Sequence, residues 1–193
     1  MKQGVRSLFA LLFGLVAAGA AHAHTGVHAD GGFTTGLAHP FLGLDHLLAM
    51  VAVGIWAAQL GGRSLLALPA AFMIFMAAGA ALGAAGVPLP HVEGMVAVSV
   101  LALGCVVGLS ARLAWQWAIP LVAGFALFHG HAHGAEMPGF ATPSLYFIGF
   151  ALATGLLHAI GVAGAAALKR HPAVVRAGGA AIAFAGALLL LSV

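Results

Sequence analysis

Charged residues are scarce in this chain. They make up 6% of its 193 residues, whereas 63% are hydrophobic and the mean hydropathy is +1.11. A soluble domain of this size needs far more charge on its surface, so the composition excludes that class. The apolar runs are long and continuous, unlike the short alternating segments of a membrane barrel. The composition therefore predicts an all-α, polytopic bundle of membrane helices.

Cysteine and clustered positive charge are almost absent as well. Cys105 is the single cysteine and lies in an apolar run, so we interpret it as a small packing residue with no disulfide role. The seven Lys and Arg form no long basic run, which argues against a nucleic-acid partner. The G-x-x-x-x-G-K-[ST] motif is missing, so this chain holds no ATP motor.

Histidine, by contrast, is abundant. The chain has eleven histidines, more than its seven Lys and Arg or its four Asp and Glu. Ionisable residues inside a membrane are expensive, and each is a functional-site hypothesis by default. The histidines are therefore the first candidates for a functional site.

The first residues are typical of a secretory signal peptide. Lys2 and Arg6 precede an apolar run, and Ala21-His22-Ala23 is an A-x-A cleavage signal. We predict a cleavable leader over residues 1–23 and one transmembrane domain over residues 24–193. The alternative is an uncleaved first membrane helix.

About six apolar spans follow the leader, each near the 20 residues that a bilayer requires. Their approximate bounds are 37–60, 65–86, 92–111, 115–133, 144–168 and 173–193. A cleaved leader would leave the mature N-terminus in the periplasm. Alternating spans then place every mature Lys and Arg on the cytoplasmic side, as the positive-inside rule requires. We therefore predict a multi-pass protein of the bacterial inner membrane.

The segment from His39 to Met50 opens the first span and carries several possible metal ligands. Pro40 suits the first turn of a helix. On one continuous helix, His39, His46 and Met50 recur at i, i+7 and i+11 and share a face. Asp45 adds a carboxylate, which costs about 2.5–3.5 kcal/mol at a helix centre and less near its end. Nitrogen and oxygen donors gathered in this way indicate a metal site, although His39 could instead cap the helix start.

A second group of donors ends the fourth span. His129 and His133 are four residues apart and share a helix face, as paired histidines do in helical zinc sites. His131 would be directed away from them. Glu136 could complete the site or neutralise a dication, which is costly in low dielectric without compensation. The alternative is a histidine cluster at the membrane interface.

Two further candidates come from other spans. Glu93 opens the third span at the same outer face, where the alternative is a solvated loop acid. His158 lies near the middle of the fifth, where the alternative is a core histidine bonded to a backbone carbonyl. Most donors therefore gather at one membrane face. The predicted metal residues are His39, Asp45, His46, Glu93, His129, His133, Glu136 and His158.

The candidate residues fall in three motifs, which are His39-Pro-x-x-Gly-x-Asp45-His46-x-Leu-x-Met50, then Val92-Glu93 followed by Ser99-Val100, and His129-Gly-x-Ala-His133-Gly-x-Glu136. Together these motifs resemble the HupE/UreJ family of bacterial nickel permeases, and the resemblance covers nearly the whole chain. The resemblance places His39, Asp45 and His46 in the family's signature and His133 and Glu136 in its second motif. It also implies nickel, and cobalt in some members, as the ion, and a link to hydrogenase or urease maturation. Donor chemistry alone suits Ni, Co and Zn better than Cu(I) and does not select nickel.

The expected function is a permease that carries a divalent ion inward and holds no permanent cofactor. Membrane lipid and the ion are its expected partners, with a homo-oligomer or a nickel-enzyme maturation system as further ones. One alternative is a metal-binding or sensing partner that does not transport. The other is a membrane enzyme, either a His-rich metalloenzyme or a Ser110–His158 protease. The predicted depths of Ser110 and His158 argue against the protease.

Overall fold

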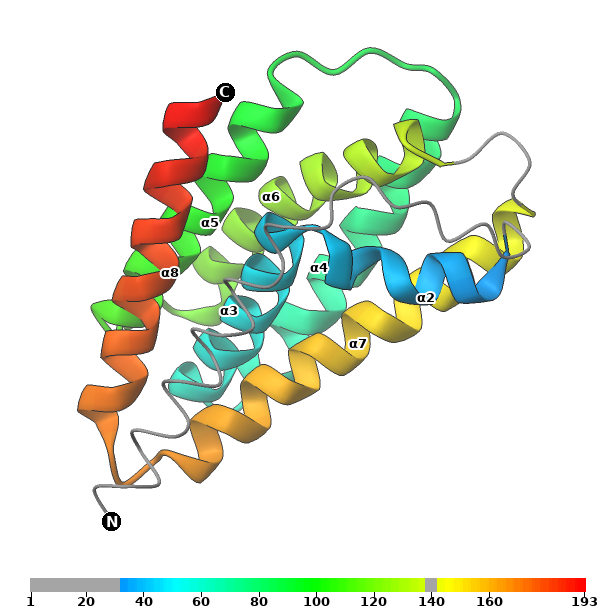
Figure 1. Ribbon diagram of the computed structural model, residues 1–193. Coiled ribbons are helices and arrows are strands. Elements are labelled where there is room, and N and C mark those ends of the chain that lie inside the picture. The colour runs from blue at the N-terminus through cyan, green and yellow to red at the C-terminus, as the bar shows by residue number, and fades with distance from the viewer. Residues whose placement is uncertain (1–31, 138–141) are drawn as a thin grey trace.

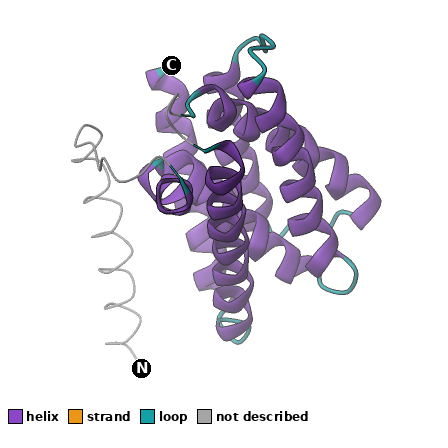
Figure 2. Cartoon of the chain, turned by 90° about the vertical axis from the view of Figure 1, so that its right-hand side faces the viewer, coloured by secondary structure: helices purple, strands orange, loops and turns teal. Residues whose placement is uncertain are grey.

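The computed structural model describes residues 32–137 and 142–193, and in this part of the chain helices joined by loops are the only regular secondary structure (Figure 2). The predicted all-α class is thereby confirmed. The predicted signal peptide, residues 1–23, lies outside the described residues. The helices are α2 (Phe33–Leu42), α3 (Leu44–Leu60), α4 (Ser64–Ala84), α5 (Val92–Gly108), α6 (Trp115–Ala135), α7 (Pro143–Ala167) and α8 (Pro172–Ser192).

The last five predicted spans agree with helices α4 to α8 to within a few residues at each end. Proline in the first turn of α7 and α8 supports their start, because its missing N–H has no helical partner there. Gly61, Gly62 and Gly86 follow helix ends with φ of 68°, 53° and 69°, a region in which glycine carries no side-chain penalty. These prolines and glycines therefore mark the starts of α7 and α8 and the ends of α3 and α4.

The predicted number of six spans is not confirmed. Three described helices are long and apolar enough to cross a membrane, namely α4, α7 and α8, and the bent pair α2–α3 adds a fourth if it counts as one span. Helix α5 has only 17 residues. Helix α6 ends in a histidine-rich turn, which lowers its hydropathy.

The first predicted span is wrong as a single helix. It breaks at Gly43, where the backbone is extended (φ −96°, ψ 114°), and α2 and α3 meet at 85°. Pro40 lies near the end of α2 and not in a first turn. His39 therefore belongs to α2 and His46 to α3, so the predicted common helix face does not exist. Any Cβ at position 43 would lie only 2.9 Å from Asp45 Oδ1, so glycine at the break also leaves room for that carboxylate.

Helix α3 occupies the centre of the bundle, where α4, α5 and α7 pack around it (Figure 1). Helix α2 lies along α7, α4 pairs with α6, and α5 pairs with α8. The fully buried residues of α3 are Ala49, Met50, Ala52, Val53, Trp56 and Ala57. Met50 is therefore a packing residue. The N-terminal end of α3 lies where α2, α6 and α7 converge.

Glycine allows α4 and α6 to pack backbone against backbone. A Cβ at Gly130 would overlap the carbonyl oxygen of Met76, and one at Gly134 would overlap that of Ala80. Small residues let membrane helices approach in this way. Since His129 and His133 lie on the same stretch of α6, this close contact also sets the depth of their side chains.

We expect Gly130→Ala to destabilise the bundle, because the added methyl group must push α4 and α6 apart. Overpacking of this kind costs about 1–3 kcal/mol. Thermal unfolding of the purified protein in detergent measures the effect. Gly124→Ala on the same helix is the control, since no atom of the described chain lies within 4 Å of its added Cβ. Equal melting temperatures for the two variants would contradict the close-packing argument.

Charge is segregated between the two ends of the bundle. Arg112 and Lys169 line a pocket of about 480 Å³ beside the C-terminal end of α3, and Arg176 donates a hydrogen bond to the Gly108 carbonyl nearby (3.1 Å). Asp45, Glu93 and Glu136 line a second pocket at the N-terminal end of α3. This separation agrees with the predicted charge asymmetry. Which end faces the cytoplasm stays a prediction.

Candidate metal centre

Four imidazoles from three helices meet at the N-terminal end of α3. The His133 ring lies 4.0 Å from that of His46 and 4.8 Å from that of His39, measured between centroids. The His129 ring lies 4.6 Å from that of His46. His129 and His133 are 0% and 1% exposed. We call these four residues the imidazole cluster. Because the first predicted span breaks at Gly43, His39 on α2 and His46 on α3 approach α6 from two directions.

Glu136 brings a carboxylate to the outer side of the imidazole cluster. Its Oε2 lies 3.5 Å from His39 Nε2. One ligand atom each from His39, His133 and Glu136 lie within 4.8 Å of one another. Ligand atoms on one ion are no more than about 4.2 Å apart when each bond is about 2.1 Å. Movements of the ligand atoms by less than an ångström would therefore bring this trio to coordination distance.

Asp45 holds His46 in one orientation. Its Oδ1 lies 2.6 Å from His46 Nδ1 and also accepts the His46 backbone N–H at 2.7 Å. An ionised carboxylate can only accept, so the ring proton sits on Nδ1 and Nε2 keeps its lone pair. His46 Nε2 is buried and has no hydrogen-bond partner among the described residues. A carboxylate behind an imidazole in this way is the usual outer-shell support of a metal-binding histidine.

Ser99 supports His129 in a similar way, a role that the sequence analysis missed. The Ser99 hydroxyl donates its only proton to the Val96 carbonyl at 2.6 Å. Its oxygen must then accept from His129 Nε2, which also lies 2.6 Å away. His129 Nδ1 is left with its lone pair, buried and unpartnered within the described chain. The available signal was the place of Ser99 in the second of the three motifs, together with its hydroxyl in a mostly apolar helix.

We expect Ser99→Ala to lower metal affinity, because the His129 ring would lose the acceptor that selects its tautomer. Loss of an outer-shell partner typically weakens metal binding by about 10–100-fold. Calorimetric titration of the purified protein with Ni²⁺ measures it. The control is Ser64→Ala, since that serine begins α4 and is not among the described residues that line either pocket. An affinity in Ser99→Ala equal to that of the control would contradict the role.

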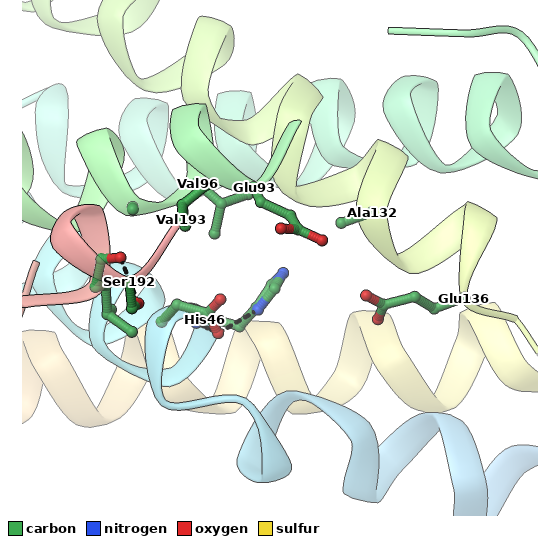
Figure 3. Close-up of a pocket in the computed structure, with 10 residues that line it drawn as sticks. His46, Glu93, Val96, Ala132, Glu136, Ser192 and Val193 are labelled. Atoms are coloured by element: carbon green, nitrogen blue, oxygen red, sulfur yellow. Dashed lines mark hydrogen bonds and ion pairs between the residues drawn. The ribbon is translucent and has the colours of Figure 1, made fainter. Parts of the chain in front are cut away.

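His46 connects the imidazole cluster to an acidic pocket of about 240 Å³, which its side chain helps to line. Asp45, Glu93 and Glu136 line it, and these are three of the four acidic residues in the whole chain. In Figure 3 the carboxylates of Glu93 and Glu136 lie on either side of the space into which the His46 ring points. Among the described residues, no Lys or Arg lines this pocket. Clefts with one sign of charge raise the local concentration of counter-ions, so this pocket attracts cations.

The other predicted residues lie outside the imidazole cluster. Glu93 reaches the pocket but not the trio of His39, His133 and Glu136. His131 is directed away, as expected, and its Nε2 lies 2.7 Å from the carbonyl oxygen of Val87. His158 is also buried and packs against Phe72, and neither of its ring nitrogens has a hydrogen-bond partner in the described part of the chain. The expected alternative, a carbonyl-bonded core histidine, is therefore not what the described residues show.

These features define a class: a helical membrane protein with a histidine-rich, acidic site at one end of its bundle. The chain belongs to the HupE/UreJ family, whose model, described as HupE / UreJ protein, matches residues 11–189. It is 48% identical over 174 residues to Protein HupE of Rhizobium leguminosarum bv. viciae, covering 89% of this chain and 90% of that protein. No solved structure matches the chain.

The family resemblance predicted from the three motifs is thereby confirmed. Membership supports a general role in nickel or cobalt transport, or as an accessory to hydrogenase and urease, and it fits a protein that is not an enzyme.

Proposed function

We propose that the protein is a permease that moves Ni²⁺, with Co²⁺ as a second substrate, through the imidazole cluster. The observation that carries the proposal is the set of buried ring nitrogens without a hydrogen-bond partner, on His46, His129 and His133. Each unsatisfied buried polar group costs about 1–3 kcal/mol. Several of them in one place are explained if the nitrogens bind a cation. Imidazole and carboxylate donors suit nickel, cobalt and zinc, and nickel follows from the family.

Entry begins at the acidic pocket. Its three carboxylates attract a hydrated dication from the aqueous side. The ion then exchanges water for His39, His133 and Glu136, whose ligand atoms already lie within 4.8 Å of one another. His46 joins through its free Nε2, which Asp45 aims by holding Nδ1. In this scheme Asp45 is a positioning residue, and its negative charge offsets part of the cost of a dication in low dielectric.

The membrane potential supplies the driving force, and the orientation of the protein sets the direction of transport. We place the acidic pocket at the periplasmic face of the inner membrane and the basic end in the cytoplasm, with residues 1–23 cleaved and residues 24–193 forming one domain. A membrane potential is worth about 2.3 kcal/mol per charge per 100 mV, or about 4.6 kcal/mol for a dication. Binding must stay moderate, because a site that holds its ion too tightly cannot conduct.

Flux into sealed proteoliposomes that contain only this protein tests the proposal. A metal-sensitive dye inside reports Ni²⁺, Co²⁺, Zn²⁺ and Mn²⁺ in parallel, with an imposed inside-negative potential. We expect saturable Ni²⁺ entry that rises with the potential and exceeds Mn²⁺ entry. Tight Ni²⁺ binding to the protein without flux would favour a binding or sensing partner instead, and redox-active iron in the purified protein would favour a metalloenzyme.

A further inference from the structure

His158 is a polar side chain that packing alone does not explain. It is 3% exposed, and both its ring nitrogens are buried without a hydrogen-bond partner among the described residues. An apolar residue of similar size would fill the same space without that penalty. The position therefore points to a ligand for the imidazole.

The rings of the imidazole cluster and of His158 lie in one row, which we call the file, and the Phe72 ring separates the two. Phe72 on α4 lies 5.8 Å from the His129 ring on one side and 5.1 Å from the His158 ring on the other, between centroids. Phe72 itself is 0% exposed. A cation leaving the imidazole cluster toward His158 therefore meets this phenyl ring first.

The inward continuation of the file reaches the basic end of the bundle. Val162 lines the pocket beside Arg112 and Lys169 and follows His158 by four residues on α7, which is about 6 Å along the helix on the same face. His158 thus lies between the acidic pocket and this second pocket. Two cationic side chains do not retain a dication, so the second pocket favours release.

We propose that His158 is an inner binding station for the transported divalent transition-metal ion, and that Phe72 is the gate between this station and the imidazole cluster. The proposal rests on the proposed permease function. It adds a second site and a barrier that divides the passage into two steps.

The donors around His158 suit brief occupancy. Thr154 lies one turn before it on α7, and its hydroxyl contacts the sulfur of Met76 at 3.8 Å while donating to the Phe150 carbonyl at 3.0 Å. One imidazole with a hydroxyl and a thioether nearby, and no carboxylate among these contacts, binds a dication more weakly than the imidazole cluster does. The ion would retain some of its water there. A weak second site is what conduction requires.

Two variants separate binding from passage. In His158→Gln we expect Ni²⁺ affinity at the imidazole cluster to stay at the wild-type value, while proteoliposome flux falls about tenfold or more because one barrier rises. In Phe72→Ala we expect the same affinity, faster Ni²⁺ flux and weaker rejection of Mn²⁺. Controls are His131→Gln, a buried histidine outside the file, and Phe75→Ala, which is on the same helix but 43% exposed.

Each outcome decides the proposal. Wild-type flux in His158→Gln would refute the inner station while leaving the permease intact. Loss of Ni²⁺ affinity in that variant would show that His158 only supports the structure of the outer site. Unchanged flux and selectivity in Phe72→Ala would refute the gate. Wild-type protein that binds Ni²⁺ but passes none would refute permeation itself and the station with it.

Discussion

Replacing His133 with alanine is expected to abolish nickel uptake. Within residues 32–137 and 142–193, His133 is the one residue whose ring lies beside both His39 and His46, and it also belongs to the trio with Glu136. Its loss removes a ligand, so the drop in Ni²⁺ affinity should exceed the 10–100-fold or so that outer-shell changes produce. Calorimetric titration measures the affinity, and uptake of radioactive nickel by cells measures transport.

His131→Gln is the matched control for His133→Ala. It changes another buried histidine of the same helix turn, and the glutamine side chain can still bond to the Val87 carbonyl. We expect near wild-type affinity and uptake in this control. If His133→Ala transports as well as His131→Gln does, the imidazole cluster is not the entry site.

Replacing Asp45 with asparagine is expected to have the second largest effect. The change is nearly isosteric, but the amide is neutral and presents either an acceptor or a donor to His46 Nδ1. The ring then loses its fixed tautomer, and the acidic pocket loses one charge next to the ion. We expect Ni²⁺ affinity to fall by about 10–100-fold, as for other outer-shell carboxylates, and uptake to fall with it.

Glu93→Gln separates the two effects of the Asp45 substitution. It removes one charge from the same pocket but touches none of the ligand trio. Its effect should be smaller and should shrink further at high ionic strength, since exposed charges are screened by salt. If both variants lose the same affinity and respond alike to salt, Asp45 acts only through its charge and does not position His46.

Local sequence rules were sufficient for most of the fold. Long apolar runs predicted α4 to α8, and Gly61, Gly62, Pro143 and Pro172 marked where helices end or begin. Because the chain has few charged residues, its histidines and acidic residues also stand out in the sequence. Because an ionisable side chain in a membrane needs a partner, the gathering of histidine and acid at one end could be expected before any geometry was known.

Those local rules could not predict contacts between helices that are far apart in the sequence. Pro40 and Gly43 allow a helix break, but they do not set its angle of 85°, which accompanies the packing of α2 along α7. The same holds for Ser99 and His129, which are 30 residues apart and share a hydrogen bond only because α5 and α6 adjoin there. The position of Phe72 between two imidazoles likewise follows from tertiary packing.

The most direct test of the imidazole cluster is X-ray absorption spectroscopy of Ni²⁺ bound to the purified protein, recorded for the wild type and for His133→Ala. The structure predicts a first shell of nitrogen and oxygen with the multiple-scattering signature of several imidazoles, and a weaker imidazole signal in the variant. A first shell of oxygen alone, or an imidazole signal that the variant leaves unchanged, would contradict the convergence of His39, His46 and His133 on one ion.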